Sequence, residues 1–123
     1  MTGEIIPERY FRGFGIVPEW GIKYSESLLL FEFCTRDNAS RSGLVNQKVA
    51  MYQKNLPNIE ERFGGQGTVL FVLDIPREKI KPTGEFCFFT DYETFKTVPY
   101  SQQLTASIYI WGGDGKTYPL RNA

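Results

Sequence analysis

The stretch that decides the fold spans residues 27–74. It contains the apolar run LLLFEFC (28–34), a long intervening segment, and a second apolar run, TVLFVLD (68–74). Short, nearly continuous apolar runs are typical of strands buried on both faces of a sheet. An apolar strand, a helix and another apolar strand predict a parallel pair joined by a right-handed crossover. One charged residue, Glu32, interrupts the first run. Because a buried, unpaired carboxylate costs several kcal/mol, we expect Glu32 to be ion-paired, at the mouth of a site or bound to a metal.

The segment between the two runs predicts one amphipathic helix. Pro57 lies inside it and predicts a bend or restart, but the apolar stripe keeps its phase across the proline, which favours one helical unit. Gly64 and Gly65 are expected to end the helix. The stripe recurs at steps of three and four residues: Val45, Val49, Tyr52, Leu56, Ile59 and Phe63. The polar residues before it offer four candidate helix caps: Asp37, Asn38, Ser40 and Ser42.

The N-terminal part gives weaker signals. Residues 1–12 have a mixed composition and are expected to run over the surface. Residues 14–17 form a short strand candidate, which stops at the turn-like sequence Pro-Glu-Trp-Gly at 18–21.

The C-terminal third is aromatic. Residues 85–90 predict a strand, and residues 91–95 a short helix capped by Thr90 or Asp91. Two further runs, 106–111 and 116–120, flank a Gly-Gly-Asp-Gly sequence and predict a hairpin. The fold class we predict is therefore α/β, with a mixed central sheet, a parallel strand-helix-strand core and a C-terminal hairpin.

Composition and length exclude several classes of function. A chain of 123 residues fits a single domain over 1–123, and its 14 basic and 14 acidic residues give no net charge to attract nucleic acid or anionic lipid. Neither a membrane-spanning run nor a signal peptide is visible. Cys34 and Cys87 lie in apolar runs, which favours reduced thiols and a cytoplasmic location over a disulfide. The chain has no histidine, which removes Ser–His and Cys–His catalysis and most zinc sites.

Glu19 and Glu32 are the candidate metal ligands. Glu19 follows a short strand candidate and a proline, and Glu32 lies near the C-terminal end of the next strong strand. If neighbouring strands bring the two together, their oxygens suit Mg²⁺ or Mn²⁺. Such an ion activates water and neutralises charge on a phosphodiester. Lys48, on the flank of the helix, is the candidate for positioning that water, and Tyr52 lies four residues further on.

The sequence Pro18-Glu19, the strand with Glu32 and the helical Lys48-x-x-x-Tyr52 resemble the restriction-endonuclease-like, PD-(D/E)XK, fold. Gln47 with Tyr52 is similar to a Gln-x-x-x-Tyr pattern of some nuclease lineages. More narrowly, residues 28–74 resemble the C-terminal domain of the replication-relaxation proteins of plasmids and mobile elements. The resemblance covers residues 14–120, with a core over 14–111.

This resemblance implies a magnesium-dependent nuclease whose partner is DNA or a replication protein. The roles it implies are catalytic for Glu19, Glu32 and Lys48 and supporting for Gln47 and Tyr52. Two positions depart from the family pattern. Glu19 stands where aspartate is usual, and Cys34 stands two residues after Glu32, where an active nuclease carries lysine. Lys48 would have to replace that lysine from the helix.

Three functions stay open. The first is a metal-dependent nuclease, which the carboxylates favour. The second is a catalytically degenerate nuclease-fold module that binds nucleic acid or a replication partner, and the third is a protein-interaction domain that uses the aromatic C-terminal third. Net neutrality favours the last two, because affinity for duplex DNA comes mainly from phosphate neutralisation. In those cases Glu32 is a structural carboxylate paired with Arg36, Arg41 or Lys48. We expect a nuclease-fold module of a plasmid or phage replication or mobile-element protein, either cleaving DNA with a metal or catalytically degenerate. The alternative is a non-enzymatic protein-interaction or nucleic-acid-binding module of a mobile element.

Overall fold

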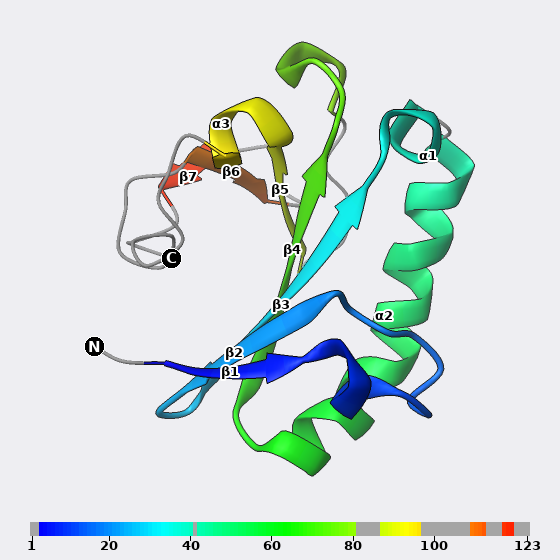
Figure 1. The fold of residues 1–123 in the computed structure, drawn as a ribbon. Coiled ribbons are helices and arrows are strands. Elements are labelled where there is room, and N and C mark those ends of the chain that lie inside the picture. Colours follow the sequence, from blue (N-terminus) through cyan, green and yellow to red (C-terminus); the bar gives the residue numbers. More distant parts are fainter. Residues whose placement is uncertain (1–2, 41, 81–86, 97–108, 113–116, 120–123) are drawn as a thin grey trace.

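A mixed β-sheet forms the centre of the molecule, with one long helix along one face (Figure 1). The computed structural model describes residues 3–40, 42–80, 87–96, 109–112 and 117–119. Five strands make up the main part of the sheet: β1 (Glu4–Pro7), β2 (Trp20–Tyr24), β3 (Ser27–Cys34), β4 (Gln66–Leu73) and β5 (Cys87–Asp91). Two short strands, β6 (Tyr109–Gly112) and β7 (Thr117–Pro119), extend it beyond β5, and all strands are neighbours in chain order.

The strand directions confirm the parallel unit predicted from residues 27–74. Strands β3 and β4 are parallel, and β4 and β5 are parallel as well. The pairs β1–β2 and β2–β3 are antiparallel. Helix α2 (Ser42–Phe63) connects β3 to β4, after a short helix α1 (Arg36–Ser40). The domain is therefore α/β with a mixed sheet, as expected.

Helix α2 continues through Pro57 as a single helix, so the prediction of one unit is confirmed. Gly64 ends it, with φ of 78° and its N–H donating to the Glu60 carbonyl at 2.7 Å. Glycine adopts this left-handed conformation without steric cost. The predicted stripe is the buried face: Val45, Val49, Tyr52, Leu56 and Ile59 are buried, and Phe63 packs partly buried against them.

The core lies on both faces of the sheet, which explains the continuous apolar runs. Successive strand residues point to opposite faces. On β3, Leu28 and Leu30 pack with α2, while Leu29 and Phe31 join a smaller cluster with Phe95 of α3 (Tyr92–Lys96). Figure 1 shows α2 and α3 on opposite sides of the sheet. By this alternation Glu32 falls on the α2 side, within the larger core.

The described residues of 1–12 are mostly exposed, as expected, but the strand expected at 14–17 was wrong. Residues 14–16 form bends, because Gly13 and Gly15 have φ of 92° and 90° and turn the chain. Residues 3–11 contain β1 and the 3₁₀ helix η1 (Glu8–Phe11). Strand β2 begins at Trp20, so Trp20 and Gly21 of the turn predicted at 18–21 lie in a strand instead. Gly21 is required there, since a Cβ atom at this position would lie 2.9 Å from the ring of the buried Phe11.

The C-terminal elements agree with the predictions where they are described. Asp91 caps α3: it accepts hydrogen bonds from the Thr94 N–H at 3.0 Å and the Thr94 hydroxyl at 2.7 Å. Strands β6 and β7 are antiparallel, as a hairpin requires. The predicted residues 85–86, 106–108, 113–116 and 120 lie outside the described residues. A short 3₁₀ helix, η2 (Arg77–Lys79), follows β4.

Two simpler expectations concern the cysteines and the membrane. Cys34 and Cys87 are both buried and free, in agreement with the reduced state predicted for them. In the described part of the chain, none of the helices combines the length and apolarity that a membrane crossing requires.

Candidate functional site

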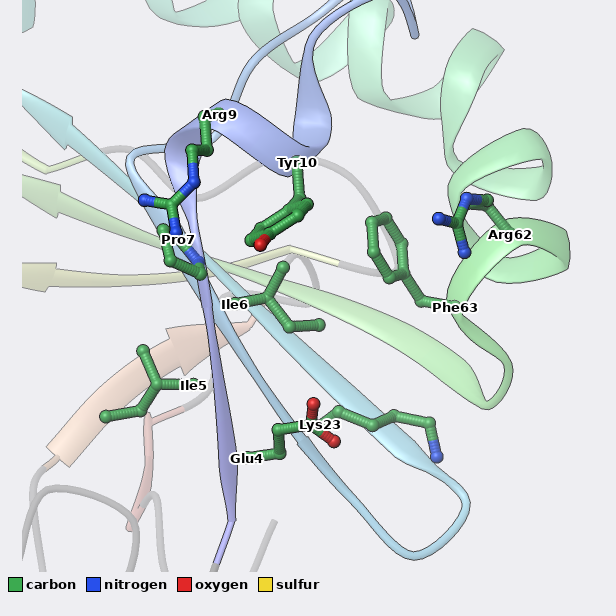
Figure 2. A pocket seen from close by; sticks show the side chains of 9 residues that line it. All are labelled: Glu4, Ile5, Ile6, Pro7, Arg9, Tyr10, Lys23, Arg62 and Phe63. Carbon is green, nitrogen blue, oxygen red and sulfur yellow. The ribbon is translucent and has the colours of Figure 1, made fainter.

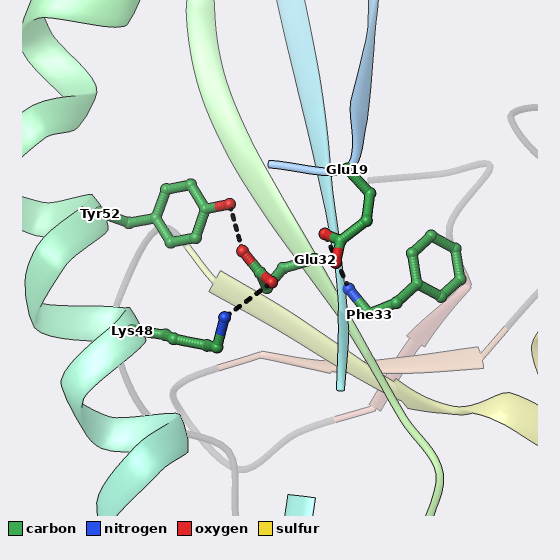
Figure 3. A network of polar contacts seen from close by, with 5 residues as sticks. All are labelled: Glu19, Glu32, Phe33, Lys48 and Tyr52. Atoms are coloured by element: carbon green, nitrogen blue, oxygen red, sulfur yellow. Dashed lines mark hydrogen bonds and ion pairs between the residues drawn. The ribbon is translucent and has the colours of Figure 1, made fainter. Parts of the chain in front are cut away.

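Glu32 is held by two donors from one face of α2 (Figure 3). The Tyr52 hydroxyl donates to Oε1 at 2.7 Å, and Lys48 Nζ donates to Oε2 at 3.0 Å. Residues four apart on a helix lie on the same face, one above the other, so Lys48 and Tyr52 reach one carboxylate together. The Glu32 side chain is only 2% exposed, whereas that of Lys48 is 33% exposed. Lys48 is thus the ion-pair partner of Glu32 and, unlike Glu32, stays partly in contact with solvent.

Glu19 approaches Glu32 from the neighbouring chain segment. The β2–β3 register ends at the pair of Trp20 and Phe31, and the Glu19 N–H donates to the Phe31 carbonyl at 3.0 Å, one residue off the partner that this register would require. Glu19 therefore lies just beyond the paired part of β2, near enough to Glu32 for the charge of Glu32 to raise its pKa. The Phe33 N–H donates to Glu19 Oε2 at 3.3 Å and directs this carboxyl toward β3 (Figure 3).

The electrostatics of the cluster follow from this proximity. Burial and the negative charge of Glu32 together raise the pKa of Glu19 from 4.5 to about 7, against the opposing effect of the Phe33 N–H. For Lys48, burial lowers the pKa, but the charge and hydrogen bond of Glu32 outweigh it, so the pKa is raised overall. Lys48 is consequently a cation at neutral pH. Once Glu19 is ionised, two carboxylates lie beside one ammonium group, and an added cation would neutralise the remaining negative charge.

The other two groups near Glu32 remain neutral. Burial, reinforced by the charge of Glu32, raises the pKa of the Cys34 thiol to about 11. The same causes raise the pKa of Tyr52 far above its usual value, so its hydroxyl stays protonated and acts as a donor. Cys34, two residues after Glu32, therefore supplies no charge to the cluster. The ammonium group beside Glu32 comes from α2 instead.

The donor set can be compared with what metals require. The described residues contain no group of three or more His, Cys, Asp or Glu side chains, so at most two carboxylates are available here. That number suits Mg²⁺ or Mn²⁺: magnesium is usually held by one or two carboxylates together with waters and substrate phosphates. Each Glu32 oxygen accepts one hydrogen bond from the protein, and a carboxylate oxygen has a second lone pair. Glu19 and Glu32 therefore match such an ion in the type and number of their oxygen donors.

Not every residue singled out in the sequence reaches this cluster. Gln47 precedes Lys48 on α2, and its side chain is exposed. Arg41, weighed as a partner for Glu32, is outside the described residues. The structure thus brings together Glu19, Glu32, Lys48 and Tyr52.

A second feature was missed by the sequence reasoning. A pocket of about 530 Å³ opens between β1, η1 and the C-terminal end of α2 (Figure 2). It brings together basic and aromatic neighbours, Arg9-Tyr10 and Arg62-Phe63, that lie about half the chain apart in sequence. Each basic-aromatic pair can be recognised in the sequence, but nothing in the sequence indicates that the two pairs line one pocket.

Comparison of the chain with protein-family models, with curated proteins and with solved structures finds no match.

Proposed function

We propose that this domain is a restriction-endonuclease-like module whose site binds Mg²⁺ or Mn²⁺ through Glu19 and Glu32 and acts on a phosphodiester. The observation that carries the proposal is the placement of the Glu19 carboxylate, held by the Phe33 N–H, beside the ion pair of Glu32 and Lys48. Burial and the neighbouring charge of Glu32 raise the pKa of Glu19 to about 7, and a cation bound beside both carboxylates would favour the ionised form. The β3–α2–β4 arrangement and the Lys48-x-x-x-Tyr52 contacts agree with the resemblance to replication-relaxation proteins.

Each residue has a distinct part in this proposal. A bound divalent ion would supply an activated water and charge neutralisation at the phosphate. Lys48, kept protonated by Glu32, can donate hydrogen bonds to a phosphate oxygen or to water but cannot take a proton from water. Tyr52 fixes the orientation of Glu32 from the core side. Glu19, half-buried beside it, forms the side of the site that an ion reaches from solvent.

A second candidate is a nuclease-fold module without catalysis. It is favoured by the burial of Glu32, both of whose oxygens accept hydrogen bonds from the protein. The neutral Cys34 thiol at the family's lysine position points the same way. In this case the cluster stabilises the fold, and the domain binds DNA or a replication protein.

The test is cleavage of supercoiled plasmid and of single-stranded DNA with Mg²⁺ or Mn²⁺, with EDTA as the metal-free control. We expect cleavage by the wild type and a loss of about 100-fold or more in Glu19→Gln and in Lys48→Met, as when one transition-state-stabilising group is removed. Glu61→Gln and Lys54→Met change exposed residues of the same types on α2 and should cleave normally.

The two candidates give different outcomes. An inactive wild type with either metal would favour the non-catalytic module. Cleavage that is equal in the wild type and in Glu19→Gln would contradict the proposed site. Far-UV circular dichroism of each variant separates loss of the site from loss of the fold.

A further inference from the structure

The pocket beside β1 is a local concentration of positive charge on a chain with no net charge. Three cations, Arg9, Lys23 and Arg62, line it, and Glu4 is the one acid in its lining (Figure 2). Glu4 stands opposite Lys23 in the β1–β2 register, and Lys23 Nζ also donates to the Ser25 carbonyl. Glu4 and Lys23 thus offset each other, which leaves the two guanidinium groups as the surplus charge.

Both arginines lie over aromatic rings. The guanidinium of Arg9 is 4.8 Å from the centre of the Tyr10 ring, and that of Arg62 is 5.2 Å from the centre of the Phe63 ring. Neither arginine forms an ion pair within the part of the chain that the structure describes. A guanidinium that stacks on a ring keeps its N–H groups free at the edge, where they match phosphate oxygens in a bidentate geometry.

The two rings differ in their surroundings. Phe63 packs against the buried Phe11, with ring centres 5.0 Å apart, and so forms a fixed wall. Tyr10 is 52% exposed, and its ring lies across the pocket from Phe63 (Figure 2). The half-exposed Tyr10 ring beside a cationic pocket offers a stacking surface for a flat group. All nucleobases can stack on such a ring, so the contact does not depend on sequence.

We propose that this pocket binds one nucleotide of a single-stranded nucleic acid, with its base on Tyr10 and the phosphates on its two sides at Arg9 and at Arg62, which lie at opposite ends of the pocket lining (Figure 2). The volume of about 530 Å³ accommodates one nucleotide and is too small for a duplex, whose bases are in any case stacked and unavailable to Tyr10. This binding site is separate from the carboxylate cluster and does not depend on whether that cluster holds a metal.

The experiment measures fluorescence anisotropy of a labelled oligothymidylate of about 12 nucleotides, in low salt and EDTA, so that cleavage plays no part. We expect saturable binding that weakens as salt is raised, since phosphate contacts release counterions. Tyr10→Ala and Arg62→Gln should each weaken binding by about tenfold or more. Tyr92→Ala and Arg12→Gln change exposed residues of the same types elsewhere and should bind like the wild type.

Two further probes decide the chemical class. A labelled polyglutamate of similar length should bind weakly, and the corresponding duplex should not compete at equal nucleotide concentration. Wild-type affinity in both Tyr10→Ala and Arg62→Gln would overturn the proposal, and so would polyglutamate binding that matches the oligonucleotide. Glu19→Gln should bind the oligonucleotide normally, so a failure of the nuclease proposal leaves this one standing.

Discussion

At Glu32, two donors from one helix face offset the cost of burying a carboxylate. The Lys48 ammonium balances its charge and the Tyr52 hydroxyl satisfies the oxygen that faces the core. Because Lys48 is partly exposed, its own desolvation is limited, whereas Tyr52 is fully buried and has no water to replace Glu32 as an acceptor. Tyr52 is therefore the contact whose loss the fold should feel most clearly.

Tyr52→Phe tests this contact. The substitution removes one hydroxyl and leaves a buried carboxylate oxygen without its donor, so we expect a loss of about 1–3 kcal/mol in the free energy of unfolding. Urea denaturation measures it. Tyr92→Phe, at a tyrosine that is 41% exposed, is the matched control and should stay within about 0.5 kcal/mol of the wild type. Equal losses in the two variants would show that the hydrogen bond to Glu32 contributes nothing.

The sequence predicts the positions of some residues of the cluster and not of others. The sequence predicts the placement of Lys48 and Tyr52, because the period of a helix puts both on the face that packs on β3. Gln47 is one position earlier, about 100° around the helix, and is exposed for that reason. The contact of Glu19 with Glu32 depends on the register between β2 and β3, which the helix period does not determine.

At the scale of elements, the predictions succeeded where one pattern was long and uniform. Strands β3 and β4 and helix α2 each carry enough apolar residues to define their period. Strand β2 reads Trp-Gly-Ile-Lys-Tyr, an alternation hidden by the neighbouring Pro18 and by Gly21. The need for that glycine comes from Phe11 packing over it, a tertiary contact that no local pattern reveals.

Replacing either of two glycines by alanine should change the free energy of unfolding, in opposite directions. Gly43 lies exposed in α2 with nothing within 4 Å of an added Cβ atom, so Gly43→Ala should raise the free energy of unfolding by about 0.5–1 kcal/mol. Gly65 has φ of 89°, and its Cβ atom would lie 2.8 Å from the Glu26 backbone oxygen. Gly65→Ala should therefore lower it by about 1–2 kcal/mol or more. Thermal or urea unfolding measures both, and changes of the same sign would contradict the assigned geometry.

At the scale of the whole molecule, β2 connects the two proposed sites. Lys23 of this strand lines the cationic pocket, and Glu19 directly precedes its first residue, Trp20. Four steps along an extended strand separate Glu19 and Lys23 by about 13 Å. A single-stranded nucleic acid of a few nucleotides can span that distance. Binding at the pocket would then hold an extended strand near the carboxylates.

The raised pKa of Glu19 gives the carboxylate pair a defined pH dependence. Its folded-state pKa of about 7 lies above the ordinary value of 4.5, so the folded protein retains a proton that the unfolded chain has released. The contribution of Glu19 to stability therefore falls as the pH rises from about 4.5 to 7, and it is lowest above that range. Since solvent screens this half-buried group, we expect the loss to be about 1–2 kcal/mol. A divalent cation competes with that proton. It therefore binds best above about pH 7, where Glu19 is ionised and its contribution to stability is lowest.

The most direct test of the metal site is calorimetric titration with Mn²⁺ at about pH 6 and about pH 8, in the wild type and in Glu19→Gln. A ligand acid with a pKa of about 7 is mostly protonated at the lower pH and mostly ionised at the higher one. We predict that the wild type binds Mn²⁺ about tenfold more tightly at the higher pH and that Glu19→Gln binds weakly at both. An Mn²⁺ affinity that is the same at both pH values, or the same in the two proteins, would contradict the assignment of Glu19 and Glu32 as a metal site.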